Sequence, residues 1–213
     1  MNVLRRYNRS SGVQIIDKDG KRQIAGYAAV WYDGTARTEF EMGSVNGARI
    51  VERMFPSGID LEGWDTLALH HHRREFVLGR RSAGTLALTI DRTGLHYLID
   101  PPDAQYARDL MLSIDRGDII GSSFGMHPED YNKKIKADRS QSGLILFNVD
   151  KPLRILDVGP TPEPAYKATT AELRSLIPQF DELEADSKPT NTPEQTRRLV
   201  NDLLADELLG VGD

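Results

Sequence analysis

The stretch Gly117-Asp-Ile-Ile-Gly-Ser-Ser-Phe-Gly-Met126 is the part of the chain on which the interpretation of the fold depends. Residues 119–126 have the length and apolar content of a β-strand, in which alternate side chains point to opposite faces. One face is then bulky and suited to a core, with Ile120, Ser122, Phe124 and Met126. The other face places Ser123 between Gly121 and Gly125.

A glycine inside a strand weakens the strand and often marks a place where a backbone or a ligand comes close. A serine hydroxyl in such cleared space suits a nucleophile beside which an extended peptide lies. The same pattern is also typical of a strand of small residues packed beneath a helix. The stretch alone leaves both interpretations open.

Composition excludes several classes of protein. The chain has no cysteine, which rules out disulfides, thiol catalysis and cysteine-bound zinc and fits a reducing cytoplasm. A net charge of −5 without a long basic block argues against a nucleic-acid partner. No window approaches the roughly 18 apolar residues of a membrane span, so no membrane association is expected. The polar residues 1–11, with three arginines, do not form a secretory signal.

The remaining pattern is dominated by strands. Strands are predicted over 22–32, 49–55, 66–72, 84–90, 94–100, 144–149 and 154–158, the last ending at Gly159-Pro160. Residues 35–50 are expected to form a loop. Glu52 is either a surface carboxylate or part of a site, and the surface interpretation is favoured. A helix is predicted over 103–116, with Asp103 as N-cap and Gly117 as the C-terminal stop. Its apolar stripe is Ala107, Leu110, Met111 and Ile114.

The chain is expected to divide into an N-terminal arm (1–21), a main domain (22–176) and a C-terminal extension (177–213). A short helix over 168–176 closes the main domain. The acidic and then Pro/Thr/Asn-rich residues 181–193 are typical of a linker. A last amphipathic helix begins with the capping box Thr192-Pro-Glu-Gln195 and carries Leu199, Leu203 and Leu204.

Three consecutive histidines, His70 to His72, invite a metal-binding interpretation. Adjacent residues of a strand alternate faces, so only His70 and His72 could share an ion. No third ligand residue lies at a sequence separation typical of a zinc site. A general base is the better functional interpretation, because the unperturbed pKa of histidine lies near neutrality.

Several blocks, taken in order, resemble one known family. They are Gly26-Tyr-Ala-Ala-Val30, Glu52-Arg-Met-Phe-Pro-Ser-Gly58, the histidine block with Leu78-Gly79-Arg80 and Ser82-Ala-Gly-Thr-Leu86, the Ser123 stretch, and Leu156-Asp-Val158 with Pro164-Ala-Tyr166. From about residue 24 to about residue 170 the chain resembles the tailed-phage prohead proteases, serine peptidases related to herpesvirus assemblin.

The resemblance implies a catalytic triad. The nucleophile falls on Ser123 and the base on His72, counted back from Leu78-Gly79-Arg80. Arg73 and His71 stand where the family usually has Asp and Asn around that histidine, so His71 stays an alternative base. The third member usually comes from a Glu-Val-Ser block, which falls on Asp157. Arg80, Arg81 and Arg154 are candidates for polar support of the oxyanion.

The fold implied is mainly β (α+β), a closed antiparallel β-barrel surrounded by a few helices, as in herpesvirus protease. The implied function is a serine endopeptidase without cofactor that cleaves capsid and scaffold precursors during prohead maturation. Its partners are the major capsid protein precursor with its scaffold region and, as a further option, a second copy of itself. Its location is the assembling prohead in the bacterial cytoplasm. The alternatives are a non-catalytic assembly or scaffold protein with this fold, and a histidine-rich metal-binding protein.

Overall fold

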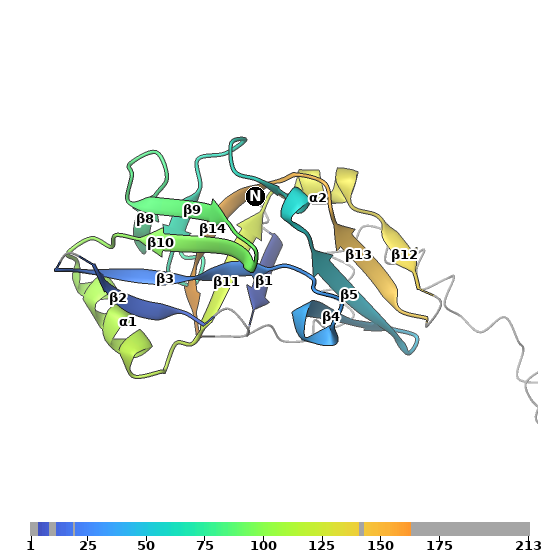
Figure 1. Ribbon diagram of the computed structural model, residues 1–213, viewed down its shortest axis with the longest axis horizontal. Coiled ribbons are helices and arrows are strands. Elements are labelled where there is room, and N and C mark those ends of the chain that lie inside the picture. The colour runs from blue at the N-terminus through green and yellow to red at the C-terminus, as the bar shows by residue number, and fades with distance from the viewer. Residues whose placement is uncertain (1–3, 9–11, 19, 141–142, 163–213) are drawn as a thin grey trace, which may run out of the picture.

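A computed structural model describes residues 4–8, 12–18, 20–140 and 143–162 (Figure 1). In this part of the chain the strands form one six-stranded and two four-stranded sheets, accompanied by two α-helices. None of the described helices is long and apolar enough to cross a membrane.

The six-stranded sheet has the strand order β1 (Leu4–Asn8), β11 (Gly121–Met126), β14 (Leu153–Thr161), β7 (Leu67–Leu69) and β8 (Val77–Arg80). The short strand β6 (Ile59–Asp60) pairs with the start of β14. β14 is the centre of this sheet, because it runs antiparallel to β11 and parallel to both β6 and β7.

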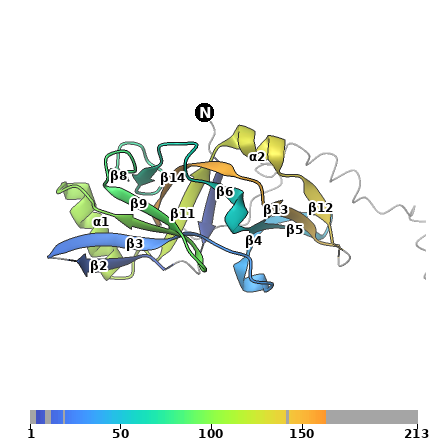
Figure 2. The ribbon, with the colours of Figure 1, turned by 45° about the horizontal axis from the view of Figure 1, so that its top comes forward.

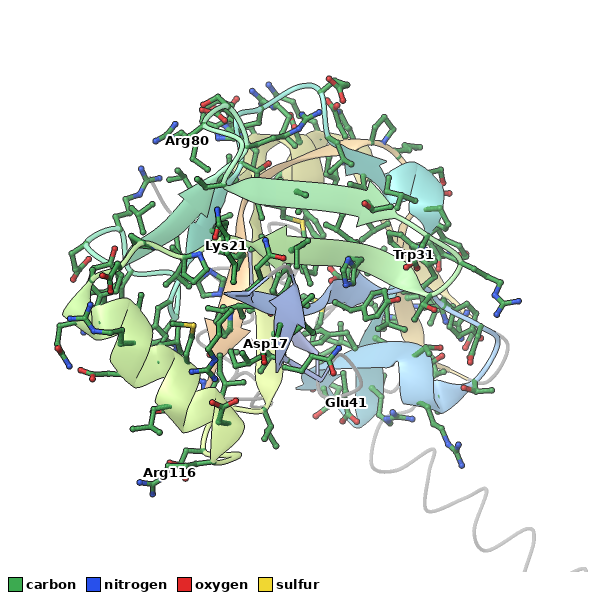
Figure 3. The ribbon with its side chains drawn as sticks, turned by 60° about the vertical axis from the view of Figure 1, so that its left-hand side comes forward. Asp17, Lys21, Trp31, Glu41, Arg80 and Arg116 are labelled. Carbon is green, nitrogen blue, oxygen red and sulfur yellow. The ribbon has the colours of Figure 1, made fainter. Side chains whose placement is uncertain are left out.

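A second sheet covers one face of the first. It consists of β2 (Gln14–Lys18), β3 (Lys21–Val30), β10 (Gly94–Ile99) and β9 (Leu86–Ile90), and its strands cross those of β11 and β14 steeply in Figure 1. Figure 3 shows its outer side, from Lys21 at one end of β3 to Trp31 beyond the other. Helix α1 (Gln105–Asp115) lies beside β2. Of the predicted stripe it buries Ala107, Leu110 and Ile114, and the fourth member, Met111, is partly buried against the core.

The third sheet lies at the other end of the molecule (Figures 1 and 2). Its order is β12 (Ala137–Arg139), β13 (Ile145–Val149), β5 (Ala48–Met54) and β4 (Glu39–Val45), with β13 parallel to β5. Helix α2 (Pro128–Lys134) connects β11 to this sheet. Short 3-10 helices precede β4 (Ala36–Thr38) and β6 (Pro56–Gly58).

The predicted closed antiparallel barrel is wrong. A barrel closes only when the outermost strands of a sheet pair with each other. Among the described strands, the outermost ones of the largest sheet, β1 and β8, are not paired with each other, and all three sheets are open. Parallel pairing of β14 with β7, and of β13 with β5, also departs from a purely antiparallel arrangement. The prediction of a mainly β chain with few helices agrees with the described elements.

Several local predictions also need correction. Residues 35–50 are not a loop, because β4 and β5 form a hairpin whose turn residues Asn46 and Gly47 have φ of 46° and 82°. Positive φ at both central positions is what a type I′ two-residue hairpin turn requires. Glu52 is fully buried on β5 rather than at the surface.

The helix prediction is wrong at its start and right at its end. Helix α1 begins after Ala104, and the expected N-cap Asp103 instead pairs with Arg108. Gly117 has φ of 78°, the left-handed conformation that commonly ends a helix. The helix expected over 168–176, the linker and the last amphipathic helix lie outside the described residues.

Candidate active site

Strand β11 is buried along its whole length, and its two faces have different surroundings. On one face, the hydroxyls of Ser122 and Tyr97 are 2.7 Å apart and hydrogen-bonded. Burial raises the pKa of the Tyr97 phenol above its usual value. A side chain at Gly26 of β3 would lie 2.6 Å from the Tyr97 hydroxyl oxygen and 2.9 Å from Ser122 Oγ. Gly26 therefore leaves the space in which this pair joins the two sheets.

The other face of β11 carries Ser123, as the alternation of side chains predicted. Ser123 lies opposite Gly159 of β14, and Gly125 lies opposite Asp157. Because opposite residues of paired strands share a face, Ser123 and Asp157 project to the same side of the sheet. The absence of a side chain at Gly125 and Gly159 leaves the space between them open to a third group.

The histidine block supplies that group, but not from a strand. β7 ends at Leu69, and His71 and His72 adopt left-handed φ angles of 51° and 59°. The His71 backbone N–H donates to the Pro160 carbonyl at 3.0 Å, and His71 Nδ1 lies 2.8 Å from Thr161 Oγ1. These bonds fasten the turn to the end of β14. The prediction that His70 to His72 continue a strand with alternating faces is therefore wrong.

The turn places the His72 ring between the other two predicted residues. His72 Nδ1 lies 2.5 Å from Asp157 Oδ1, and His72 Nε2 lies 2.5 Å from Ser123 Oγ. All three residues are buried, with exposed fractions of 7% for His72, 5% for Asp157 and 0% for Ser123. A neutral imidazole has one N–H donor and one acceptor nitrogen, so the tautomer that donates from Nδ1 to the Asp157 carboxylate is the one whose Nε2 can accept from the serine hydroxyl.

The sequence also matches a family model. The model is that of the caudovirus prohead serine protease, and it matches residues 10–182. The chain belongs to the caudovirus prohead serine protease family. No curated protein and no solved structure matched the chain. The matched region includes Ser123, His72 and Asp157.

Sequence reasoning missed Gly159, whose role depends on a close backbone approach. A Cβ atom on Gly159 would lie 2.0 Å from the Leu69 carbonyl oxygen, and the residue has φ of 154°. Only glycine combines that conformation with that approach. The sequence predicts that the strand ends at Gly159-Pro160, whereas β14 continues to Thr161. A glycine directly after the buried run Ile155 to Val158 was the available signal.

The other histidines have separate surroundings. The His70 ring lies against Phe76, with ring centroids 6.1 Å apart, and burial lowers the pKa of His70, with a smaller effect from His71. His71 contacts Thr161 rather than the Ser123 hydroxyl. Across the described ranges, no group of three or more acidic or histidine side chains is arranged to hold a metal ion.

The three arginines considered for oxyanion support contact carboxylates. Arg80 pairs with Asp65 at 2.6 Å and Arg81 with Glu62 at 2.5 Å. The Arg154 guanidinium donates to both oxygens of Asp130, at 2.7 and 2.9 Å. These hydrogen bonds hold the pKa of Asp130 down to about 2.

Proposed function

We propose that this prohead protease is an active serine endopeptidase in which Ser123 is the nucleophile, His72 the general base and Asp157 the residue that orients it. The observation that carries the proposal is the position of the His72 ring, with one nitrogen 2.5 Å from Ser123 Oγ and the other 2.5 Å from Asp157 Oδ1. A nucleophile, a base within hydrogen-bond reach and a third group that orients the base form the arrangement known from serine hydrolases.

The chemistry follows from these contacts. His72 Nε2 takes the hydroxyl proton as Ser123 Oγ attacks the carbonyl carbon of the scissile peptide bond. The same nitrogen returns the proton to the departing amine, which leaves an acyl group on Ser123. Water then attacks the ester with the same base, and the released acid frees Ser123. Asp157 fixes the ring tautomer and stabilises the imidazolium that forms in each half-reaction.

The family membership supports the choice of substrate. Members are prohead proteases, so the substrates we propose are the major capsid protein precursor and its scaffold region. Cleavage then takes place in the assembling prohead, within the cytoplasm of the bacterial host. If Ser123 proves unreactive, the alternative function, a non-catalytic role in capsid assembly, would be accepted instead.

The test is labelling with a serine-directed fluorophosphonate, followed by mass spectrometry to locate the label, and co-expression with the capsid precursor. We expect label on Ser123 and a shortened capsid protein in the wild type. Both should be lost in Ser123→Ala and in His72→Ala. Ser122→Ala is the matched control, since Ser122 bonds to Tyr97 on the other face, and it should retain cleavage. His71→Ala should be impaired but active, because it removes only the side-chain bond to Thr161 that helps to hold the turn. If Ser122→Ala lost labelling and cleavage while Ser123→Ala kept them, the nucleophile would be Ser122 and the proposal would be wrong.

A further inference from the structure

Ser123 has no exposed surface in the structure, although a protease nucleophile must meet a substrate backbone. Three of the four sides around it are closed by parts of the core. His72 and Asp157 lie over its face of the sheet, and the sheet containing Tyr97 covers the opposite face. β14 takes one edge of β11 and carries Asp157. None of these elements can leave without dismantling the candidate site.

The fourth side is closed by β1. This strand pairs antiparallel with β11 over five residues, with Tyr7 opposite Ser123 and Arg6 opposite Phe124. Figures 1 and 2 both show β1 alongside β11, at the border of the sheet. Among the described strands its only ladder is the one with β11, so β1 is hydrogen-bonded along one edge, although it also lies near β3 of the second sheet. Strands held in this way belong to the less stable parts of a fold.

An extended peptide binds a sheet edge by adding a strand, and its backbone then makes the ladder hydrogen bonds. The edge of β11 that β1 occupies is the one beside Ser123 that is not part of the core. We propose that β1 is a displaceable strand on the substrate-binding edge of β11, and that an extended segment of the capsid precursor takes its place. The inference rests on the proposed function, because it assigns a substrate to the same site.

Two proline substitutions in the full-length chain test it, Arg6→Pro and Tyr7→Pro. Neighbouring residues of a strand direct their N–H groups to opposite sides, so one of the two prolines removes a ladder donor to β11. The other replaces an outward N–H, a position that an edge strand tolerates, and is the matched control. The variant that loses the ladder donor should label at Ser123 about five to ten times faster, corresponding to the loss of one backbone hydrogen bond.

A synthetic peptide with the sequence of residues 2–10 supplies β1 in trans. Added in excess to the faster variant, it should slow labelling to the wild-type rate, whereas a scrambled peptide should not. Labelling at the wild-type rate in both proline variants, while hydrogen exchange shows residues 4–8 to be open, would overturn the proposal.

A Ser123→Ala background separates this inference from the catalytic one. In that background, the amides of residues 122–126 should exchange hydrogen faster in the proline variant that loses the ladder donor to β11. Adding the peptide should restore their protection. Suppose that the peptide restores protection, but that no protein with an intact Ser123 is labelled. The assignment of β1 to the substrate-binding edge would then hold, and the catalytic role of Ser123 would be rejected. Label on Ser123 without protection by the peptide would leave the protease and remove the edge assignment.

Discussion

Residues 70–72 form the turn after β7, here called the histidine turn. Replacing Gly159 by alanine should move the histidine turn and slow the reaction of Ser123, although the three proposed catalytic side chains are unchanged. The new Cβ atom would lie 2.0 Å from the Leu69 carbonyl oxygen, 3.1 Å from its carbon and 3.2 Å from the Leu69 nitrogen. All three contacts are with backbone atoms, so no side-chain rotation relieves them. An ordinary carbon–oxygen contact is at least about 3.3 Å, so Leu69 and β14 must separate by more than about 1 Å.

That shift reaches the candidate site directly. Leu69 is the last residue of β7, and the turn that carries His72 begins with the next residue. The His72 ring is held 2.5 Å from Ser123 Oγ, and a displacement of about 1 Å breaks that contact. A misplacement of about 1 Å can lower a rate by about a hundredfold. Overpacking together with a strained backbone is expected to cost about 2–6 kcal/mol of unfolding free energy.

The assay is the rate of fluorophosphonate labelling at Ser123, measured beside thermal unfolding. Gly84→Ala is the control, because Gly84 has φ of 71° but a Cβ atom added there would meet no heavy atom within 4 Å. The control should lose some stability and keep its labelling rate. Wild-type labelling by folded Gly159→Ala protein would refute the reasoning, since it would show that β7 and the histidine turn do not depend on this close approach.

Three further outcomes are expected. Asp157→Asn should lower cleavage of the capsid precursor by on the order of 10³–10⁴-fold, because the amide no longer selects the productive His72 tautomer, and a loss below tenfold would argue against its orienting role. Tyr97→Phe should reduce the free energy of unfolding by about 1 kcal/mol. In a double-mutant cycle with Ser122→Ala, measured by unfolding in denaturant, the two effects should be clearly non-additive, and additive effects would contradict the hydrogen bond between the sheets. The pKa of about 2 for Asp130 lies below the usual value near 4, so between these two values the native state binds fewer protons than the unfolded state. The stabilisation that the ionised Asp130 contributes to the native state is therefore complete above about pH 5 and is lost as the pH falls towards 2. Asp130→Asn should therefore remove about 2 kcal/mol of the acid-induced loss of stability, and identical pH dependence in both proteins would exclude this pair as its source.

The faces of β11 could be predicted from the sequence because a strand has a fixed period of two. Ser122 bonds to Tyr97 on one side and Ser123 to His72 on the other, as the alternation requires. The pairing of Ser123 with His72 and Asp157 came from the order of the family blocks, since no local rule relates residues so far apart along the chain. Their catalytic roles stay predictions.

The histidine turn and the far end of β14 could not be predicted, for related reasons. Left-handed φ angles at His71 and His72 are uncommon for residues other than glycine, and they depend on bonds to Pro160 and Thr161 that form only in the folded chain. Proline normally ends a strand because it lacks an N–H group. β14 tolerates Pro160 because its ladder with β7 already stops at Val158, so no partner strand needs that donor.

The position of β14 along the chain has a consequence for biosynthesis. β14 is the last described strand, yet it is the one that joins β11, β7 and β6 into a sheet. While a nascent chain still lacks residues 153–161, β11 has no β14 beside it and the histidine turn has no Pro160 or Thr161 to hold it. Chains are synthesised from the N-terminus, so Ser123 and His72 both exist before anything brings them together. With the catalytic roles proposed above, the growing polypeptide could not cleave a peptide bond until nearly the whole of the described fold has been made.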